Sequence, residues 1–356
     1  MSNTATVLAF DFGASSGRAI RAVYDGQNLT YEEIHRFENV PIEKDGHLCW
    51  DVETLLKEIH TAIQKAGTFD SLGFDTWGVD FGLLDTDGHL LANPVHYRDA
   101  RTNGKPEQAV ACMPAEELYA HTGNQIMAIN TLFQLLALQE QESELLQKAE
   151  QILFMPDLFA ALLGAEPVCE RSIASTSQML DPRTGQWSRE VLTAYGLKEN
   201  HFAPLVASGT VTGTLTTGAK IIAVAGHDTQ CASAAMPCAE EDAEHTAFLS
   251  CGTWSLLGTE LDTPILTADS CQSGLSNELG ANGKINYLKN IIGLWLIQES
   301  RREYKRRGQA YSFAELEQQA LAAEPLRSFI DPDAPEFVAP GNLPGRIQEF
   351  CRKTGP

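Results

Sequence analysis

The chain has 356 residues, of which 43% are hydrophobic, and 47 acidic against 26 basic residues give it a formal net charge of -21. This length exceeds the usual size of a single hydrophobic core, so we expect two domains. The negative charge argues against nucleic acid or an anionic membrane as the partner. The sequence contains no apolar run long enough to span a membrane, and its N-terminus lacks a basic region followed by an apolar one. We therefore expect a cytoplasmic protein with no membrane association.

The cysteines and histidines show no metal-binding spacing. The eight cysteines occur singly, without a CxxC pair, and the nine histidines form no HxxxH or HExxH pattern. Reduced thiols are therefore expected, and a zinc site made of protein side chains is not.

The first motif is the segment VLAFDFGASSGRAIRAV at residues 7–23. Its apolar start predicts a buried strand that ends near Asp11, and a second strand follows the turn. In the turn, two glycines give conformational freedom, while Ser15 and Ser16 add hydroxyl groups to a row of backbone amides that suits phosphate oxygens. A purely structural hairpin would look the same, so both interpretations stay open. The Gly-Lys-Ser/Thr of a Walker loop is absent.

The next elements indicate a mixed α/β domain. Residues 29–37 read as a third strand, and short turns favour antiparallel pairing with the first two. A helix follows Asp51, which can cap it, and ends at Gly67. Its apolar residues recur at helical spacing. Residues 71–75 then form a further strand.

The segment DTWGVDFG contains two carboxylates, Asp75 and Asp80, on either side of Trp77 and Gly78. Carboxylates accept hydroxyl protons and an indole packs on C–H groups, so this segment can bind a polyol. The alternative is a tight turn at a strand edge with Trp77 in the core. The polar cluster at residues 96–101 could line the same site or form surface ion pairs.

Helices are predicted at residues 131–149 and 156–163, and a strand at 220–225 leads into the turn GHDT. At this strand end Asp228 is a candidate general base, although it could also be the N-cap of the next helix. Residues 246–260 (TAFLSCGTWSLLGTE) repeat the strand-turn-strand pattern of the opening motif. Two such clips suggest two related domains that face each other over a cleft.

Taken together, DFGASSGR, DTWGVDFGLLD, HYRDARTNG, GHDT, SCGTWSLLG and LKNIIGLWLIQES resemble the carbohydrate kinases that include glycerol kinase and xylulokinase, and within them the rhamnulokinases. The resemblance covers essentially the whole chain. It implies an α/β fold of two actin-like or ribonuclease-H-like ATPase domains around a cleft. ATP, Mg²⁺ and the ketose L-rhamnulose would meet there, and the 1-hydroxyl of the sugar would be phosphorylated by a monomer or homodimer.

The resemblance also implies roles for individual residues. Asp228 would be the general base, and Asp11 would lie near the magnesium ion. Four residues would bind the ketose: Gly78, His227, Thr229 and Asn290, the last on a helix that Gly308 ends. Seven would bind the nucleotide: Ala14, Ser15, Ser16, Gly17, Arg18, Thr253 and Gln298.

The resemblance implies more sequence after residue 356, including an adenosine motif with adjacent glycines that is not found here. We therefore expect a sugar-binding kinase domain at residues 1–240, a partial nucleotide-binding domain at 241–356, and little kinase activity from these residues alone. Three alternatives stay open: a kinase for another ketose or polyol, a catalytically impaired sugar- or nucleotide-binding fragment or regulator, and another ATPase of the same fold.

Overall fold

The computed structural model describes residues 4–239, 242 and 245–355 as two compact units. The first unit comprises Met1–Thr246 and Thr259–Leu288, and the second comprises Ala247–Gly258 and Lys289–Pro356. Among the described residues, no helix is both long enough and apolar enough to cross a lipid bilayer.

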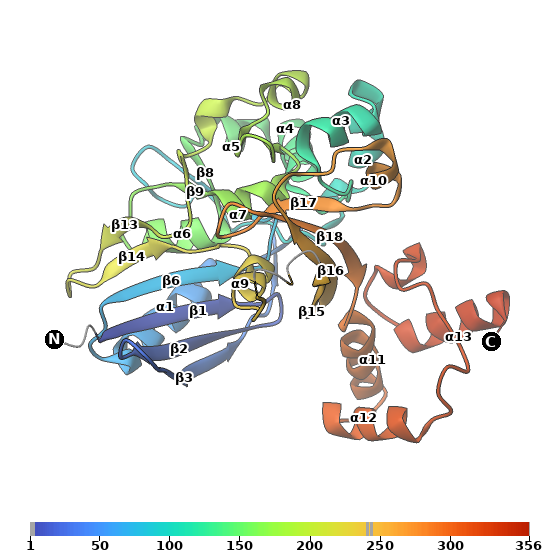
Figure 1. Ribbon diagram of the computed structural model, residues 1–356. Coiled ribbons are helices and arrows are strands. Elements are labelled where there is room, and N and C mark those ends of the chain that lie inside the picture. Colours follow the sequence, from blue (N-terminus) through green and yellow to red (C-terminus); the bar gives the residue numbers. More distant parts are fainter. Residues whose placement is uncertain (1–3, 240–241, 243–244, 356) are drawn as a thin grey trace. The chain divides into compact units, whose positions relative to one another are not determined.

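A six-stranded sheet forms the centre of the first unit, with the strand order β13-β14-β6-β1-β2-β3 (Figure 1). Strand β1 pairs antiparallel with β2, which pairs antiparallel with β3, as the short turns predict. On its other side β1 runs parallel to β6, and β6 runs parallel to β14. The strands are β1 (Ala5–Phe12), β2 (Ser16–Tyr24), β3 (Leu29–Glu38), β6 (Ser71–Thr76), β13 (Thr210–Thr214) and β14 (Lys220–Ala223).

Alternating aromatic residues fix the register of β1 and β6. Phe10 is paired with Phe74 across the two strands, and their rings stack with centroids 4.8 Å apart. Phe12 stacks in turn on Phe159 of helix α6 (Met155–Leu162) at 4.9 Å. Because side chains alternate along a strand, the residues between these aromatics point to the other face. The same register therefore sets Asp11 opposite Asp75, one residue before each strand ends.

Local signals account for the elements between these strands. Helix α1 (Val52–Ala66) begins where predicted, because the Asp51 carboxylate accepts a hydrogen bond from the backbone N–H of Thr54. The hairpin of β4 (Ile42–Lys44) and β5 (His47–Cys49) turns through Asp45 and Gly46, whose φ angles are 53° and 86°. Two consecutive positive φ angles are typical of a type I′ turn.

The first unit also contains shorter strands and further helices. The helix predicted at residues 131–149 is in fact two helices, because the backbone of Glu142 leaves the helical region (φ -138°, ψ 45°). The strands are β7 (Phe81–Leu84), β8 (Gln151–Phe154), β9 (Cys169–Glu170), β10 (Leu180–Asp181), β11 (Gln186–Trp187), β12 (Leu205–Val206) and β17 (Ser276–Leu279). The helices are α2 (Lys105–Cys112), α3 (Ala115–Thr122), α4 (Thr131–Gln141), α5 (Ser143–Lys148), α7 (Arg171–Ala174), α8 (Arg189–Ala194), α9 (Asp228–Ala234) and α10 (Ala268–Gln272).

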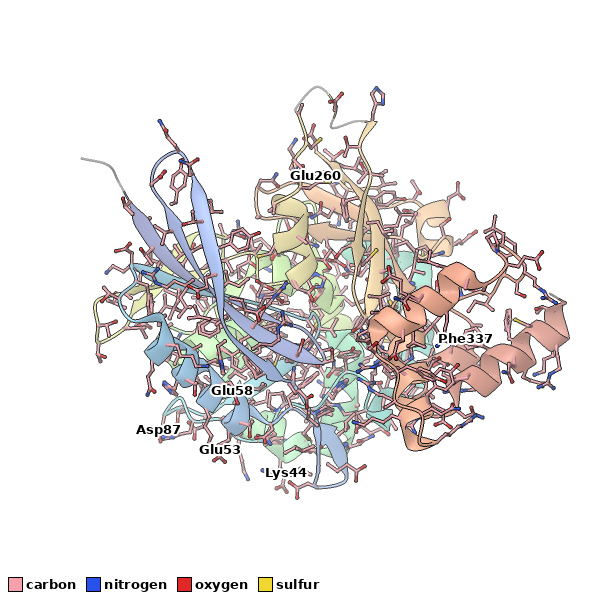
Figure 2. The ribbon with its side chains drawn as sticks, turned by 90° about the horizontal axis from the view of Figure 1, so that it is seen from below. Lys44, Glu53, Glu58, Asp87, Glu260 and Phe337 are labelled. Atoms are coloured by element: carbon pink, nitrogen blue, oxygen red, sulfur yellow. The ribbon has the colours of Figure 1, made fainter. Side chains whose placement is uncertain are left out.

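The second unit has its own small core. Phe337 and Leu343 are fully buried, and Phe337 lies inside this unit (Figure 2). The hairpin of β15 (Phe248–Cys251) with β16 (Trp254–Leu261) confirms the strand-turn-strand pattern of residues 246–260. Helices α11 (Trp295–Arg306), α12 (Phe313–Ala322) and α13 (Leu343–Thr354) follow. The helix predicted to carry Asn290 is wrong at its start, because Asn290 lies on strand β18 (Ile285–Ile292) and α11 begins only at Trp295.

Candidate active site

Two carboxylates mark the ends of β1 and β6. Nε of Arg18 donates to Oδ2 of Asp11 at 2.7 Å, and this ion pair joins β1 to β2 close to the turn between them. Burial raises the pKa of Asp75 well above its usual value, and the charges of Asp11 and Asp228 raise it further. Carboxylates at the ends of neighbouring strands repel each other when both are charged, and a bound cation would reduce this repulsion.

The turn between β1 and β2 is held from its flank by Asn39. Its backbone N–H donates to the carbonyl of Ser15 and its side chain donates to the carbonyl of Gly13, at 3.1 and 3.0 Å. Within the described part of the chain, the backbone N–H groups of Ala14 and Ser15 donate to no protein atom. These two amides are available for an anion, as the nest requires.

The reason given for the glycines of this turn is wrong. Neither Gly13 nor Gly17 has a positive φ angle, so conformational freedom is not what requires them. Gly17 is required by lack of space, because a Cβ atom there would lie 2.2 Å from Cζ of Phe37. Gly17 lets the Phe37 ring pack on the hairpin.

The segment DTWGVDFG divides into a buried half and an open half. Asp80 is fully buried and accepts from the indoles of Trp50 and Trp77 at 2.6 and 3.0 Å, and from Gln134 at 2.8 Å. Burial raises the pKa of Asp80 to about 6 against these hydrogen bonds. Asp80 and Trp77 therefore hold the turn together from inside, and the interpretation as a core Trp applies to this half.

Gly78 is the partly exposed residue of the same turn. A Cβ atom there would lie 3.3 Å from Cγ2 of Thr176 and 3.4 Å from Nε2 of His227, so any side chain at this position would pack against both residues. The next residue, Val79, has a φ angle of 67°, which is strained for a β-branched side chain. Its N–H donates to Oγ1 of Thr176, and its carbonyl accepts from Oγ1 of Thr131, which holds it there. Such stored strain is common beside binding sites.

Asp228 is the first residue of helix α9, and the N-cap is His227, not Asp228 as the alternative had it. One carboxylate oxygen accepts from the backbone N–H of Thr229 at 2.6 Å. The side chain remains 39% exposed. Burial raises the pKa of Asp228, and the nearby Asp11 adds to this against the opposing effect of His227. A carboxylate with a raised pKa and open access has the properties of a general base.

His227 joins Asp228 to a buried acid. Its Nδ1 lies 3.0 Å from Oε2 of Glu278 and its Nε2 lies 3.3 Å from Oδ1 of Asp228. Burial alone would lower the pKa of His227, but the charge and hydrogen bond of Glu278, together with Asp228 and Asp75, raise it to about 9. The imidazole is therefore protonated at neutral pH and lies between two carboxylates.

Two acidic residues of this site carry no local motif and were missed. Glu278 on β17 is 4% exposed and also accepts from Gln230 at 2.7 Å. Glu170 is 1% exposed, and its Oε2 accepts from the backbone N–H of Gly226, directly before His227, at 3.0 Å. Burial is what distinguishes these two acids from the others, and the burial of a single acidic residue cannot be deduced from the sequence.

The second unit contains the other predicted nucleotide residues. Oγ1 of Thr253 donates to Oε1 of Gln298 on α11 at 3.2 Å, so the structure brings these two together. The carbonyl of Thr253 accepts from the backbone N–H groups of Gly293 and Trp295, which ties the β15–β16 turn to the start of α11. Asn290 belongs to this unit as well.

Known protein families match both halves of the chain. The N-terminal domain of the FGGY family of carbohydrate kinases matches residues 6–234, and the C-terminal domain matches residues 247–355. The chain belongs to the FGGY family of carbohydrate kinases. It is 41% identical to a rhamnulokinase of Bacteroides thetaiotaomicron, over 98% of this chain and 73% of that protein. A rhamnulokinase of Enterococcus faecalis is 40% identical, over 98% of this chain and 72% of its own length.

The solved structures agree on the FGGY fold. A ligand-bound xylulose kinase from Lactobacillus acidophilus superposes with a TM-score of 0.71 at 16% sequence identity, over 90% of this chain. The chain spans 66% of the length of that kinase. At such low identity the likeness shows the fold alone, and it confirms the predicted two-domain α/β architecture of a carbohydrate kinase.

Proposed function

We propose that the chain serves the ATP-dependent phosphorylation of the 1-hydroxyl of L-rhamnulose, with Asp228 as the general base. The observation that carries the proposal is the partly exposed Asp228 carboxylate at the start of α9, beside the protonated His227, which in turn lies near the partly exposed Gly78. The rhamnulokinases that it resembles at 40–41% identity support L-rhamnulose over other ketoses.

In this mechanism Asp228 accepts the proton of the sugar hydroxyl, the hydroxyl oxygen bonds to the γ-phosphorus of ATP, and the bond from that phosphorus to the leaving ADP breaks. Its raised pKa strengthens it as a base, while Thr229 fixes the position of its second oxygen. His227 contributes a positive charge next to Asp228, and the partly exposed Gly78 contributes backbone surface on which the sugar would lie. Phosphoryl transfer depends more on position and charge neutralisation than on covalent help.

The residues also fit the two cofactors of such a reaction. Asp11, with the carboxyl group of Asp75 opposite it on the neighbouring strand, has the donor chemistry that would hold Mg²⁺, which would neutralise phosphate charge when bound. The unpartnered amides in the turn from Ala14 to Arg18 suit phosphate oxygens, and Thr253 with Gln298 would lie on the nucleotide side. We assign sugar binding to residues 1–240 and nucleotide binding to residues 241–356 as part of this proposal.

The base is tested by Asp228→Asn, with Asp51→Asn at the N-cap of α1 as the matched control. Asp228→Asn should lower turnover by roughly 10²–10⁴-fold, the usual share of a general base, and should leave the circular dichroism spectrum unchanged. Turnover is measured as ADP release in a coupled assay with L-rhamnulose. Undiminished turnover in this variant would remove Asp228 from the mechanism.

The substrate is tested by isothermal titration with L-rhamnulose, D-xylulose and glycerol, with and without ATP, because binding requires only the sugar-side residues. L-rhamnulose should bind most tightly. Tighter binding of D-xylulose or glycerol would assign a different substrate. Binding of ATP together with no binding of any of the three substrates would favour another ATPase of the same fold.

A further inference from the structure

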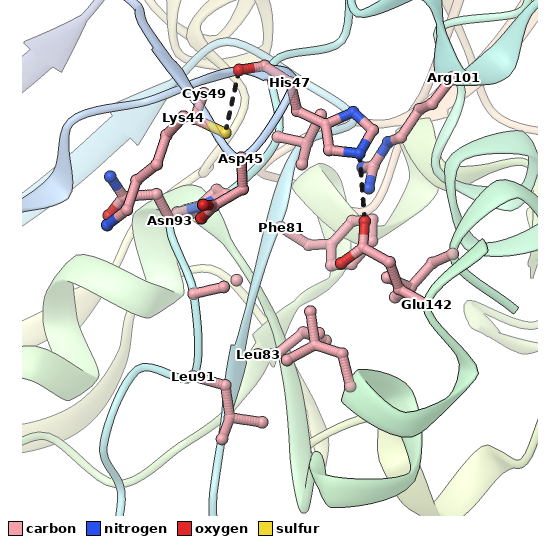
Figure 3. A pocket seen from close by; sticks show the side chains of 16 residues that line it. Lys44, Asp45, His47, Cys49, Phe81, Leu83, Leu91, Asn93, Arg101 and Glu142 are labelled. Carbon is pink, nitrogen blue, oxygen red and sulfur yellow. Dashed lines mark hydrogen bonds and ion pairs between the residues drawn. The ribbon is translucent and has the colours of Figure 1, made fainter.

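A pocket lies in the first unit, on residues that the proposed kinase reaction does not use. It has a volume of about 160 Å³ and is lined by side chains from the β4–β5 hairpin, from β7 and from helices α4 and α5 (Figure 3). A cavity of only ~10–15 Å³ holds one water molecule, so this pocket has room for a small organic molecule. We call it the Arg101 pocket; its main walls are Lys44, His47, Phe81, Leu83, Arg101 and Glu142.

Arg101 provides the unusual feature of this pocket. It is only 9% exposed, its guanidinium end is directed at the pocket, and its Nε–H has no hydrogen-bond partner (Figure 3). Among the described residues, the only hydrogen bond from this guanidinium group goes from Nη2 to Oε1 of Gln134 at 2.9 Å. No carboxylate in the described part of the chain forms an ion pair with it.

An arginine this deeply buried is normally paired with an acid, because an uncompensated buried charge is costly. Asp99, Glu142 and the fully buried Asp80 act on this charge from nearby, but their hydrogen bonds go to other groups; Asp80 accepts from Trp50, Trp77 and Gln134. Asp99 accepts from Leu48 N–H and from Arg101's own backbone N–H, and it contacts Nδ1 of His47 at 3.0 Å. Glu142 lies 3.3 Å from Nε2 of His47 at the pocket rim. The buried Nε–H is therefore without a protein acceptor, and the guanidinium group to which it belongs lines the pocket.

The charges of the walls limit what that ligand can be. A guanidinium group only donates hydrogen bonds, so the group that it meets must be an acceptor, and an anion is the best one. Asp45 and Glu142 also line the pocket, which disfavours a multiply charged phosphate. Phe81, Leu83 and Leu138 add an apolar wall. These features together fit a single carboxylate on a short apolar body.

We propose that the Arg101 pocket binds a small monocarboxylate, with its carboxylate on the guanidinium group of Arg101 and its apolar end against Phe81 and Leu83. This site is separate from Asp228 and His227, and its occupation requires neither ATP nor sugar.

The test is ligand-observed NMR on the whole chain with propionate and pyruvate as probes, and with propionamide and inorganic phosphate as comparisons. Both carboxylates should bind saturably in the millimolar range expected for so small a ligand. Propionamide, which has the same shape without the charge, should bind at least about tenfold more weakly, the effect of one lost charge-assisted contact.

Three variants locate the binding. Arg101→Met removes the guanidinium group, and Leu145→Trp fills the pocket from its partly buried edge, so the proposal does not depend on one variant folding. Each should weaken propionate binding by about tenfold or more. Arg189→Met changes an arginine that is 87% exposed and should have no effect. Absence of saturable binding, equal binding of propionamide, tighter binding of phosphate, or propionate binding that survives Leu145→Trp would overturn the proposal.

Discussion

At the scale of single residues, the charge of His227 depends on Glu278. The imidazole has a pKa raised to about 9 against the lowering effect of its own burial. In Glu278→Gln the opposing charge is removed, and the loss of one close ion pair is expected to lower the pKa of His227 by about 1–3 units. The pKa is measured from the histidine ring signals in NMR spectra recorded over a pH series.

Glu58→Gln is the matched control, because Glu58 also contacts a histidine, His35, at 2.5 Å but lies on helix α1. It should leave His227 unchanged. In the wild type, the raised pKa contributes stability that is complete below pH 6.5 and is lost as the pH rises to about 9. In Glu278→Gln this pH dependence should be flatter. A His227 midpoint that stays near 9 would show that Glu278 is not the source of the shift.

Asp80 is a second residue whose burial makes a clear prediction. Its two oxygens accept from Trp50, Trp77, Gln134 and the backbone N–H of Tyr97. An asparagine offers only one acceptor, so Asp80→Asn leaves a buried donor without a partner. The free energy of unfolding should fall by about 1–3 kcal/mol, measured by urea denaturation. Asp51→Asn should lower the free energy of unfolding far less, because asparagine caps a helix N-terminus about as well as aspartate does. Equal losses in the two variants would contradict the role of Asp80 inside the turn.

At the scale of elements, the β1–β2 hairpin tests whether Gly17 serves packing. A Cβ atom at Gly17 would collide with the Phe37 ring at 2.2 Å. Gly17→Ala should therefore reduce the free energy of unfolding by about 1–3 kcal/mol, the usual cost of overpacking. Combination with Phe37→Leu should recover part of this loss, since two contacting residues are coupled. Additive losses in the denaturation series would mean that Gly17 is required for another reason.

The elements that the sequence predicts well are those with local signals. The Asp51 cap acts within one helical turn, and the structure contains it. The apolar start of the opening motif does form a strand, but its burial alternates, because Leu8 and Phe10 are buried while Ala9 is exposed. The start of α11 is different. Residues after Asn290 have helical spacing, but pairing with a neighbouring strand extends β18 to Ile292, and a distant partner is invisible to a local pattern.

The same limit applies to the candidate site. Asp11, Gly78 and Asp228 could be predicted because each lies at the end of a strand or in a short glycine-containing turn. Glu278 and Glu170 are far from His227 in the sequence, and only the folded chain brings their carboxylates to it or to the adjacent Gly226. Residues that position a site through long-range contacts therefore escape prediction from one sequence.

At the scale of the whole molecule, each of the two units has a hydrophobic core among its described residues. The large core of the first unit includes Leu8, Phe10 and Ile59, while Phe337 and Leu343 belong to a small cluster in the second unit. Phe337 is fully buried, contacts Phe350 with ring centroids 5.3 Å apart, and accepts from the indole of Trp295 through its carbonyl. A core this small depends on each large side chain.

Phe337→Ala should therefore reduce the stability of the second unit by about 3–5 kcal/mol, the usual cost of a buried Phe→Ala change. Hydrogen exchange measures the effect in each unit separately: amides of α11 and α13 should exchange faster, while those of β1 and β6 should not change. Phe329→Ala is the matched control, because that side chain is 69% exposed and should alter neither unit. Faster exchange throughout β1 and β6 in Phe337→Ala would show that the two cores form a single cooperative unit.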